Sequence, residues 1–282
     1  VHNVIKQGTG AIEIKSGYGL NIDSEKKMLE VISEINKSTE IIVKSTFLGA
    51  HAFPKEFSKN KHQYVDLIIN NMLPEFHKLQ LINYVDVFCE KGYFDLSQSE
   101  KIISKAQELG IQTKIHVNQF NSIGGIKLAV KYNALSVDHL EVLNDKDLEI
   151  LKNSSTMPVA LPTCSYFLGI NYTPARKIID SGLPLAIASD YNPGSSPSGN
   201  MNFVVSTACI KMKMTTEEAI NAATINGAYS MGISDKAGSI TIGKIANLII
   251  TDKLNSIDEI PYSFGCDKIS KVILAGAIVG VN

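Results

Sequence analysis

Two histidines and an aspartate follow apolar segments of the sequence, where a parallel sheet would present them along one edge. His116 is the last residue but one of the segment at 113–117, His139 follows the segment at 134–137, and Asp190 follows the segment at 185–189. Catalytic residues of (β/α)8 barrels stand at the carboxyl ends of strands, so we expect these side chains to share one rim with Gln119. Imidazole and carboxylate are ligands of catalytic Zn²⁺ or Fe²⁺, which acidify a bound water. The pattern therefore predicts a metal site that activates water.

Structural roles are the alternatives for each residue taken singly. A histidine in an apolar strand is more often a core residue, and an aspartate before Asn-Pro-Gly often caps a turn. His51, in the segment LGAHAFP, is equally compatible with a site residue and a surface loop. Tyr18, between Gly17 and Gly19, either packs over its glycine turn or orients a ligand.

The elements that must position these residues alternate between apolar strands and amphipathic helices, which is typical of parallel α/β folds. The segment at 24–36 places Met28, Leu29, Ile32 and Ile35 on one helical face. Seven strands are predicted, at residues 11–15, 41–47, 84–89, 113–117, 134–137, 156–161 and 185–189. A closed (β/α)8 barrel has one more strand, so the chain is expected to hold an incomplete barrel at 1–235. From Gly238 short β segments and turns replace this pattern, which predicts a small β domain at 236–282.

Composition favours small-molecule chemistry. The chain has 282 residues, enough for a large core, with 27 basic and 28 acidic residues. This balance shows no nucleic-acid or membrane surface. Four cysteines lie far apart without a CxxC pair, and no apolar stretch approaches the length of a membrane span. We therefore expect reduced thiols and a cytoplasmic protein. The chain begins with Val1, close to its first strand, and reads like part of a longer protein.

Eight motifs along the chain resemble the imidazolonepropionase family of the amidohydrolase superfamily. GKxAxL alone indicates the superfamily, whereas KSGYGL, FLGAH and DxNPGSSP together are specific to a much narrower group of proteins. The matching segments are EIKSGYGL, TFLGAHAFP, DVFCEKGYF, KIHVNQFNSIGG, LSVDHLE, LPTCSYFL, ASDYNPGSSP and GSITIGKIANLIITD. The resemblance implies a metal-dependent (β/α)8 barrel with a β-sandwich built from both chain ends. It also implies hydrolysis of 4-imidazolone-5-propanoate to N-formimidoyl-L-glutamate in histidine degradation.

The resemblance assigns roles to individual residues by motif. It implies that His116 and Asp190 are metal ligands, with Zn²⁺ or Fe as the metal. Asp190 and His139 are the implied catalytic residues: Asp190 moves the proton of the attacking water to the leaving ring nitrogen, and His139 stabilises the developing oxyanion. The implied substrate-binding residues are Tyr18, His51, Gln119, Asn192, Gly194 and Ser195. The loop that holds the last three is expected to bind the propanoate carboxylate through backbone N–H groups.

Several features of the family are missing from this sequence. It contains no HxH pair, which supplies two metal ligands on the family's first barrel strand, and its one arginine, Arg176, lies in a helical pattern. Asn247 replaces the aspartate that is usual after GKxA. We therefore expect the chain alone to be inactive and to bind metal poorly, since a catalytic zinc site usually has three protein ligands.

Two other functions are compatible with the residues: hydrolysis of another cyclic amide, and anion binding without catalysis. Metal ligands are shared across the superfamily while substrate loops differ, so the first alternative changes the substrate and keeps the metal chemistry. In the second, the NPGSSPSG loop binds phosphate or carboxylate and the histidines are core residues. For partners, we expect a small-molecule substrate, no nucleic acid and no membrane, and the resemblance suggests a homodimer.

Overall fold

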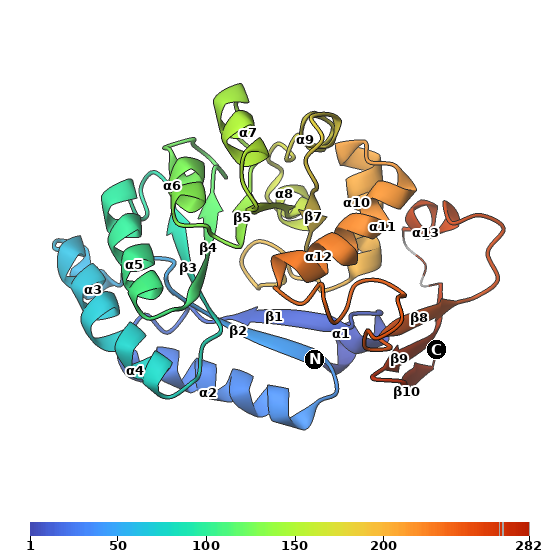
Figure 1. Ribbon diagram of the computed structural model, residues 1–282, viewed down its shortest axis with the longest axis horizontal. Helices are drawn as coiled ribbons and strands as arrows, with labels where there is room; N and C mark the ends of the chain where they lie inside the picture. The colour runs from blue at the N-terminus through green and yellow to red at the C-terminus, as the bar shows by residue number, and fades with distance from the viewer. Residues whose placement is uncertain (265, 267, 282) are drawn as a thin grey trace. The chain divides into compact units, whose positions relative to one another are not determined.

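The computed structural model in Figure 1 describes residues 1–264, 266 and 268–281. The chain divides into two compact units. The N-terminal unit comprises Glu13–Thr39 and Val43–Thr156, and the C-terminal unit comprises Val1–Ile12, Glu40–Ile42 and Met157–Asn282. The predicted division at residue 235 stays a prediction.

The N-terminal unit alternates strands and helices as the sequence predicts. The carboxyl ends of five strands lie in this unit. These strands are β1 (Ala11–Lys15), β2 (Ile42–Ala50), β3 (Tyr84–Cys89), β4 (Gln112–Val117) and β5 (Ser136–His139). The helices are α2 (Ile22–Ser38), the 3-10 turn η1 (Lys55–Phe57), α3 (Lys61–Leu67), the π-helical turn η2 (Ile68–Met72), α4 (Leu73–Lys78), α5 (Leu96–Glu108), α6 (Gly125–Lys131) and α7 (Asp145–Lys152).

The C-terminal unit contains two short strands among helices and a separate antiparallel sheet. Its helices are α1 (His2–Lys6), α8 (Pro162–Leu168), α9 (Ala175–Asp180), α10 (Met201–Met212), α11 (Thr216–Ala223), α12 (Ile225–Ser230) and α13 (Glu259–Tyr262). Its strands are β6 (Met157–Ala160), β7 (Ala186–Ile187), β8 (Leu248–Thr251), β9 (Ile269–Leu274) and β10 (Ala277–Val281). A capping box begins α11: Thr215 Oγ1 accepts from the Glu218 N–H, and the Glu218 side chain accepts from the Thr215 N–H.

The sheet order confirms the predicted fold class, an α/β amidohydrolase-type barrel of seven strands with a small β segment. Among the described residues, strands β1 to β7 follow one another in the sheet as they do in the chain, and β1 and β7 are the two ends of that order. The pairs β2–β3, β3–β4, β4–β5 and β6–β7 are parallel. Strands β8 to β10 form the small antiparallel sheet, drawn in red in Figure 1.

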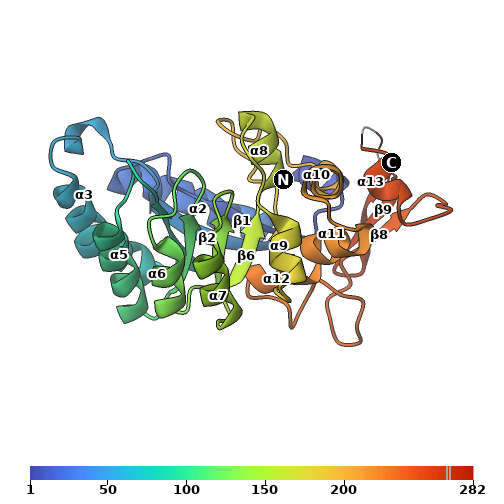
Figure 2. The ribbon, with the colours of Figure 1, turned by 90° about the horizontal axis from the view of Figure 1, so that it is seen from above.

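The two faces of β3, β4 and β5 differ in polarity, and this difference positions the site. Pairing aligns Asp86 with Lys114 and His116 with Asp138, so these polar side chains share one face. The opposite face carries apolar residues such as Ile115 and packs against α5 and α6 (Figure 1). Figure 2 shows α5, α6 and α7 as a row of neighbouring helices. The helices thus bury the apolar face and leave the polar face for chemistry.

Asn247, which replaces the usual aspartate, has a clear structural role within the C-terminal unit. Its Nδ2 donates to the Gly10 carbonyl at 2.8 Å, and its Oδ1 accepts from the Ala275 N–H at 2.9 Å. Only an amide donates and accepts in this way, because an ionised carboxylate has no N–H.

Among the residues that the structure describes, no helix combines the length and the apolar character needed to cross a membrane.

Candidate active site

Four residues singled out in the sequence lie in one cluster of aromatic and imidazole rings in the N-terminal unit. We define the ring cluster as Tyr18, His51, Phe88, His116 and His139. Ring centroids are 5.6 Å apart for Tyr18 and His51, and 5.2 Å apart for His116 and His139. Phe88 joins the two pairs, at 6.1 Å from His51, 6.1 Å from His116 and 6.5 Å from His139. Residues from segments more than a hundred positions apart therefore meet at one place.

Each ring stands at or beyond the carboxyl-terminal part of a different strand. Phe88 and His116 are paired residues of β3 and β4, and His139 is the last residue of β5. Tyr18 and His51 follow β1 and β2. Parallel strands bring these ends to the same edge, as the sequence predicts.

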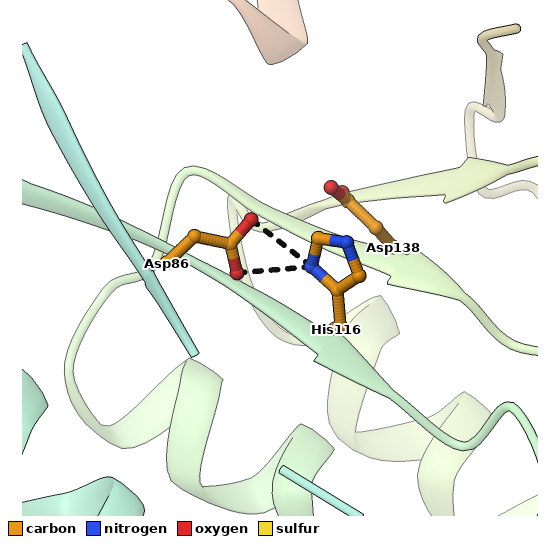
Figure 3. A group of neighbouring side chains, drawn as sticks. All are labelled: Asp86, His116 and Asp138. Atoms are coloured by element: carbon orange, nitrogen blue, oxygen red, sulfur yellow. Dashed lines mark hydrogen bonds and ion pairs between the residues drawn. The ribbon is translucent and has the colours of Figure 1, made fainter. Parts of the chain in front are cut away.

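His116 is held by Asp86 from the neighbouring strand. Its Nδ1 lies 3.1 Å from Oδ1 and 3.0 Å from Oδ2 of Asp86 (Figure 3). A carboxylate only accepts hydrogen bonds, so in the neutral form of His116 the proton is on Nδ1 and Nε2 has the lone pair. Both side chains are buried. This is the arrangement in which a histidine binds a metal through one nitrogen while a carboxylate orients it through the other.

A group of alternating charges lies on the same polar face as His116. We define the interior charge cluster as Glu13, Lys15, Asp86, Lys114 and Asp138. Lys15 Nζ lies 2.7 Å from Glu13, 2.7 Å from Asp86 and 3.7 Å from Asp138, and Lys114 forms an ion pair with Glu13. Three carboxylates stand against two ammonium groups, so the cluster carries one excess negative charge.

These ion pairs outweigh the cost of burial for the carboxylates. Burial opposes ionisation of Glu13, but attraction to Lys114 and Lys15 holds its pKa at about 2. Burial likewise opposes ionisation of Asp86, but His116 and Lys15 hold its pKa well below the ordinary value. Burial would lower the pKa of Lys15, whereas the carboxylates of Asp86, Glu13 and Asp138 raise it well above its usual range. Glu13, Asp86 and Lys15 are therefore ionised at neutral pH.

The residues present fit a metal ion. Asp86, His116 and Asp138 offer ligand atoms that all lie within 4.8 Å of one another, and this group could hold a metal (Figure 3). Asp138 also accepts from Ser136 Oγ at 2.7 Å. Lys15 pairs with both aspartates, and Nδ1 of His116 faces Asp86, so Nε2 is the His116 nitrogen that could bind a cation. The excess negative charge favours such a cation.

His139 occupies a strained backbone position. Its φ is 88° and that of Leu140 is 67°, in the left-handed region that residues with side chains rarely adopt. The neighbouring Asn118 supports this turn: its Nδ2 donates to the Val142 carbonyl at 2.8 Å, and its carbonyl accepts from the Val142 N–H at 2.8 Å. The Nδ1 of His139 lies 3.4 Å from Glu141 Oε1. The strain places a buried imidazole beside His116.

Gln119 follows β4 and is also buried. Its loop is fixed by Glu90, whose Oε2 accepts from the N–H groups of Phe120 at 3.0 Å and Asn121 at 3.2 Å. Glu90 is fully buried at the end of β3. Glu90 thus attaches the loop that carries Gln119 to the end of the neighbouring strand β3.

The other predicted site residues form a compact loop in the C-terminal unit. Asp190, with φ 49°, accepts from Ser195 Oγ at 3.3 Å, and its carbonyl accepts from Asn192 Nδ2 at 2.6 Å. The N–H groups of Gly194 and Ser195 donate to Asn192 Oδ1 at 2.9 and 2.8 Å. A carboxylate bound here must compete with the Asn192 amide for these N–H groups. The pairing of Asp190 with His116 as metal ligands stays a prediction.

Sequence reasoning missed the charged residues that support the rings. Glu13, Lys15, Asp86, Lys114 and Asp138 alternate with apolar residues in strands whose other face is covered by helices. That period of two was the available signal. Arg176 is excluded from the site: it pairs with Asp180 and Glu218 on helices of the C-terminal unit.

The sequence of this chain matches a protein family and several known proteins. The sequence model of the amidohydrolase family matches residues 94–279. The chain is similar to imidazolonepropionase of Flavobacterium johnsoniae, with 61% identity over 279 residues that cover 99% of this chain and 68% of that protein. It is also similar to imidazolonepropionase of Christiangramia forsetii, with 59% identity over 98% of this chain and 67% of that protein.

Solved structures share the fold at low sequence identity. An adenosine deaminase from Xanthomonas campestris with bound zinc matches with a TM-score of 0.75 and 17% identity, over 99% of this chain and 69% of that one. A triazine hydrolase variant matches with a TM-score of 0.78 and 12% identity, over 99% of this chain and 70% of that one. At these identities the likeness is one of fold alone.

Proposed function

The chain belongs to the imidazolonepropionase family of amidohydrolases, and from that premise we propose that the full-length protein hydrolyses 4-imidazolone-5-propanoate to N-formimidoyl-L-glutamate. The ring cluster carries the proposal. Tyr18, His51, His116 and His139 come from four separate family motifs, and the fold brings them together as two ring pairs that Phe88 joins. A non-catalytic barrel does not need a strained, buried imidazole beside a second one.

We propose His116 and Asp190 as metal ligands, with Zn²⁺ or Fe as the metal. Because His116 donates through Nδ1 to Asp86, its Nε2 is left for this role. When bound, such a metal acidifies a water molecule and polarises a carbonyl. The relatives of known structure include proteins with bound zinc, which supports a metal in this fold.

The chain's own residues would then move the protons and hold the substrate. Asp190 accepts the proton of the attacking water and returns it to the ring nitrogen that leaves. His139, whose Nδ1 faces Glu141, would direct Nε2 at the oxyanion that develops on the ring carbonyl. Tyr18, His51 and Gln119 would contact the imidazolone.

The loop of Asn192, Gly194 and Ser195 would bind the propanoate. The N–H groups of Gly194 and Ser195 both donate to one oxygen, Asn192 Oδ1. This shows that the loop can present two donors to a single acceptor. A substrate carboxylate would take the place of that amide oxygen as the Asn192 side chain turns away.

The test is steady-state turnover by the full-length protein, with metal content measured on the same sample. Hydrolysis of imidazolonepropanoate with one Zn or Fe per chain supports the proposal. Faster hydrolysis of a hydantoin-like ring would replace it with another cyclic-amide amidohydrolase. Absence of both metal and turnover, with carboxylate binding retained, would replace it with an anion-binding barrel.

We further infer a cytoplasmic homodimer with no nucleic-acid or membrane partner. Four free cysteines support a reducing compartment. Light scattering of the full-length protein tests the dimer: a monomeric mass at micromolar concentration would contradict it.

A further inference from the structure

A buried glutamate holds the loop that carries Tyr18. Glu25 lies in the first turns of α2 and is 0% exposed. Its Oε1 accepts from the N–H groups of Gly19 at 2.7 Å and Leu20 at 2.9 Å, and its Oε2 accepts from the Gly17 N–H at 2.9 Å. Three N–H groups of one short loop therefore donate to a single carboxylate. Nothing in the family motifs assigns a role to this residue.

The loop has a backbone path that it could not keep unaided. Gly17 has φ 109° and Leu20 has φ 55°, both in the left-handed region. A Cβ at Gly17 would lie 2.5 Å from the Leu48 carbonyl oxygen, so the backbone of the loop lies directly against strand β2. Besides the bonds to Glu25, one side-chain bond supports this path: Asn21 Nδ2 donates to the Gly19 carbonyl at 3.0 Å. The charge-assisted bonds that the loop N–H groups donate to Glu25 offset its strain.

The position of Tyr18 depends on these bonds. The residues on either side of it, Gly17 and Gly19, both donate to Glu25. The Tyr18 side chain itself is 56% exposed, and its ring packs edge-on to His51. One carboxylate therefore holds the backbone on both sides of Tyr18, and the direction in which the side chain leaves the loop depends on that backbone.

We propose that Glu25 is a positioning residue of the active site, which acts on the substrate through Tyr18. This inference rests on the proposed function. The carboxylate preorganises the loop, so that Tyr18 meets the substrate without first being ordered. Glu25→Gln has nearly the same volume, but it loses the charge and turns an NH₂ group towards N–H donors. It should lower kcat/KM by roughly 10- to 100-fold, the cost of a small displacement of a binding group.

A double-mutant cycle distinguishes positioning from general stability. In a Tyr18→Ala background, Glu25→Gln should lower kcat/KM of the full-length protein by no more than about twofold, because the group it positions is gone. Glu90→Gln is the matched control: it is another buried glutamate that binds backbone N–H groups, but it holds the Gln119 loop. Its effect should be the same with and without Tyr18. An equal effect of Glu25→Gln in both backgrounds would overturn the proposal.

Hydrogen exchange tests the same inference without turnover. The amides of Gly17, Gly19 and Leu20 should exchange faster in Glu25→Gln than in the wild type, while those of Phe120 and Asn121 should not change. Unchanged exchange at all three amides would overturn the proposal even if imidazolonepropanoate is hydrolysed normally. If the wild type lacks this activity, the proposed function fails, and loop exchange alone decides whether Glu25 holds the Tyr18 loop.

Discussion

Replacing Glu13 with glutamine should destabilise the protein by about 3 to 4 kcal/mol at neutral pH. Lys114 is 3% exposed and pairs with Glu13, which also accepts from Lys15 at 2.7 Å and Thr46 at 2.5 Å. Without this carboxylate the Lys114 ammonium is buried unpaired, a loss that typically costs about 3–5 kcal/mol. The pKa of Glu13 gives a similar value: a fall from 4.5 to about 2 corresponds to roughly 3 kcal/mol.

The pH dependence gives the sign of this effect. The pKa of Glu13 is lower in the folded state, so its stabilisation is fully present above about pH 4.5 and is lost as the pH falls towards 2. The Glu13→Gln protein should lack this part of the acid dependence. Adding Lys114→Met should recover most of the loss, because the unpaired charge is then removed as well.

Urea unfolding at pH 7 and across the acid range measures these effects. Glu100→Gln is the control, since Glu100 pairs with Lys131 at the surface, where side chains are 41% and 62% exposed. It should cost at most about 1 kcal/mol. If Glu13→Gln costs no more than Glu100→Gln, or keeps the acid dependence of the wild type, the ionised interior cluster is refuted.

Three further predictions follow from single contacts and from the ligand count. Tyr18→Phe in the full-length protein should lose about 1–3 kcal/mol in kcat/KM, and an unchanged value would make Tyr18 a packing residue. Asn247→Asp should lower the free energy of unfolding by about 1–3 kcal/mol at pH 7, because its bond to the Gly10 carbonyl is lost; equal urea midpoints would contradict this. The 282-residue chain alone should show no turnover and less than one metal per chain, since His116 and Asp190 are only two ligands and Lys15 already pairs with Asp86 and Asp138; stoichiometric metal with ordinary turnover would contradict this.

Most of the strand pattern could be predicted from apolar runs. The strands at 11–15 and 84–89 have the predicted bounds. The second strand ends at Ala50 and not at 47, because Gly49 continues the strand: a Cβ there would lie 2.4 Å from the Phe47 ring. Glycine in a strand signals a close approach as well as a turn, and sequence alone does not separate the two.

The helical segment around Tyr64 shows a second limit. Tyr64, Ile68, Ile69 and Met72 recur at a helical period, which predicts one helix through Met72. The structure instead has α3, the π-helical turn η2 and α4. Pro74 stands in the first turn of α4 and has no N–H to donate to the preceding turn. A π-helical turn before it changes the hydrogen-bond pattern there, which a hydrophobic period does not reveal.

For the site, the histidines could be predicted from their positions at strand ends. The charged residues beside them come together only when strands far apart in the sequence pair. Glu13 and Lys114 are 101 residues apart, so a charge in each strand looks like a solvent-facing residue until the strands are placed. Glu25 looks like an ordinary polar residue at a helix start. Its burial arises only because the Gly17–Leu20 loop folds back on it, which depends on the close contact of Gly17 with Leu48.

The most direct test of the account is turnover of 4-imidazolone-5-propanoate by the full-length protein and by its Asp190→Asn variant. If Asp190 moves the proton of the attacking water, the wild type should hydrolyse this substrate, and the variant should lose turnover more completely than it loses substrate binding. Binding is measured by calorimetry on the same samples. Near-normal turnover by the Asp190→Asn protein, or no hydrolysis by a metal-loaded wild type, would contradict the account.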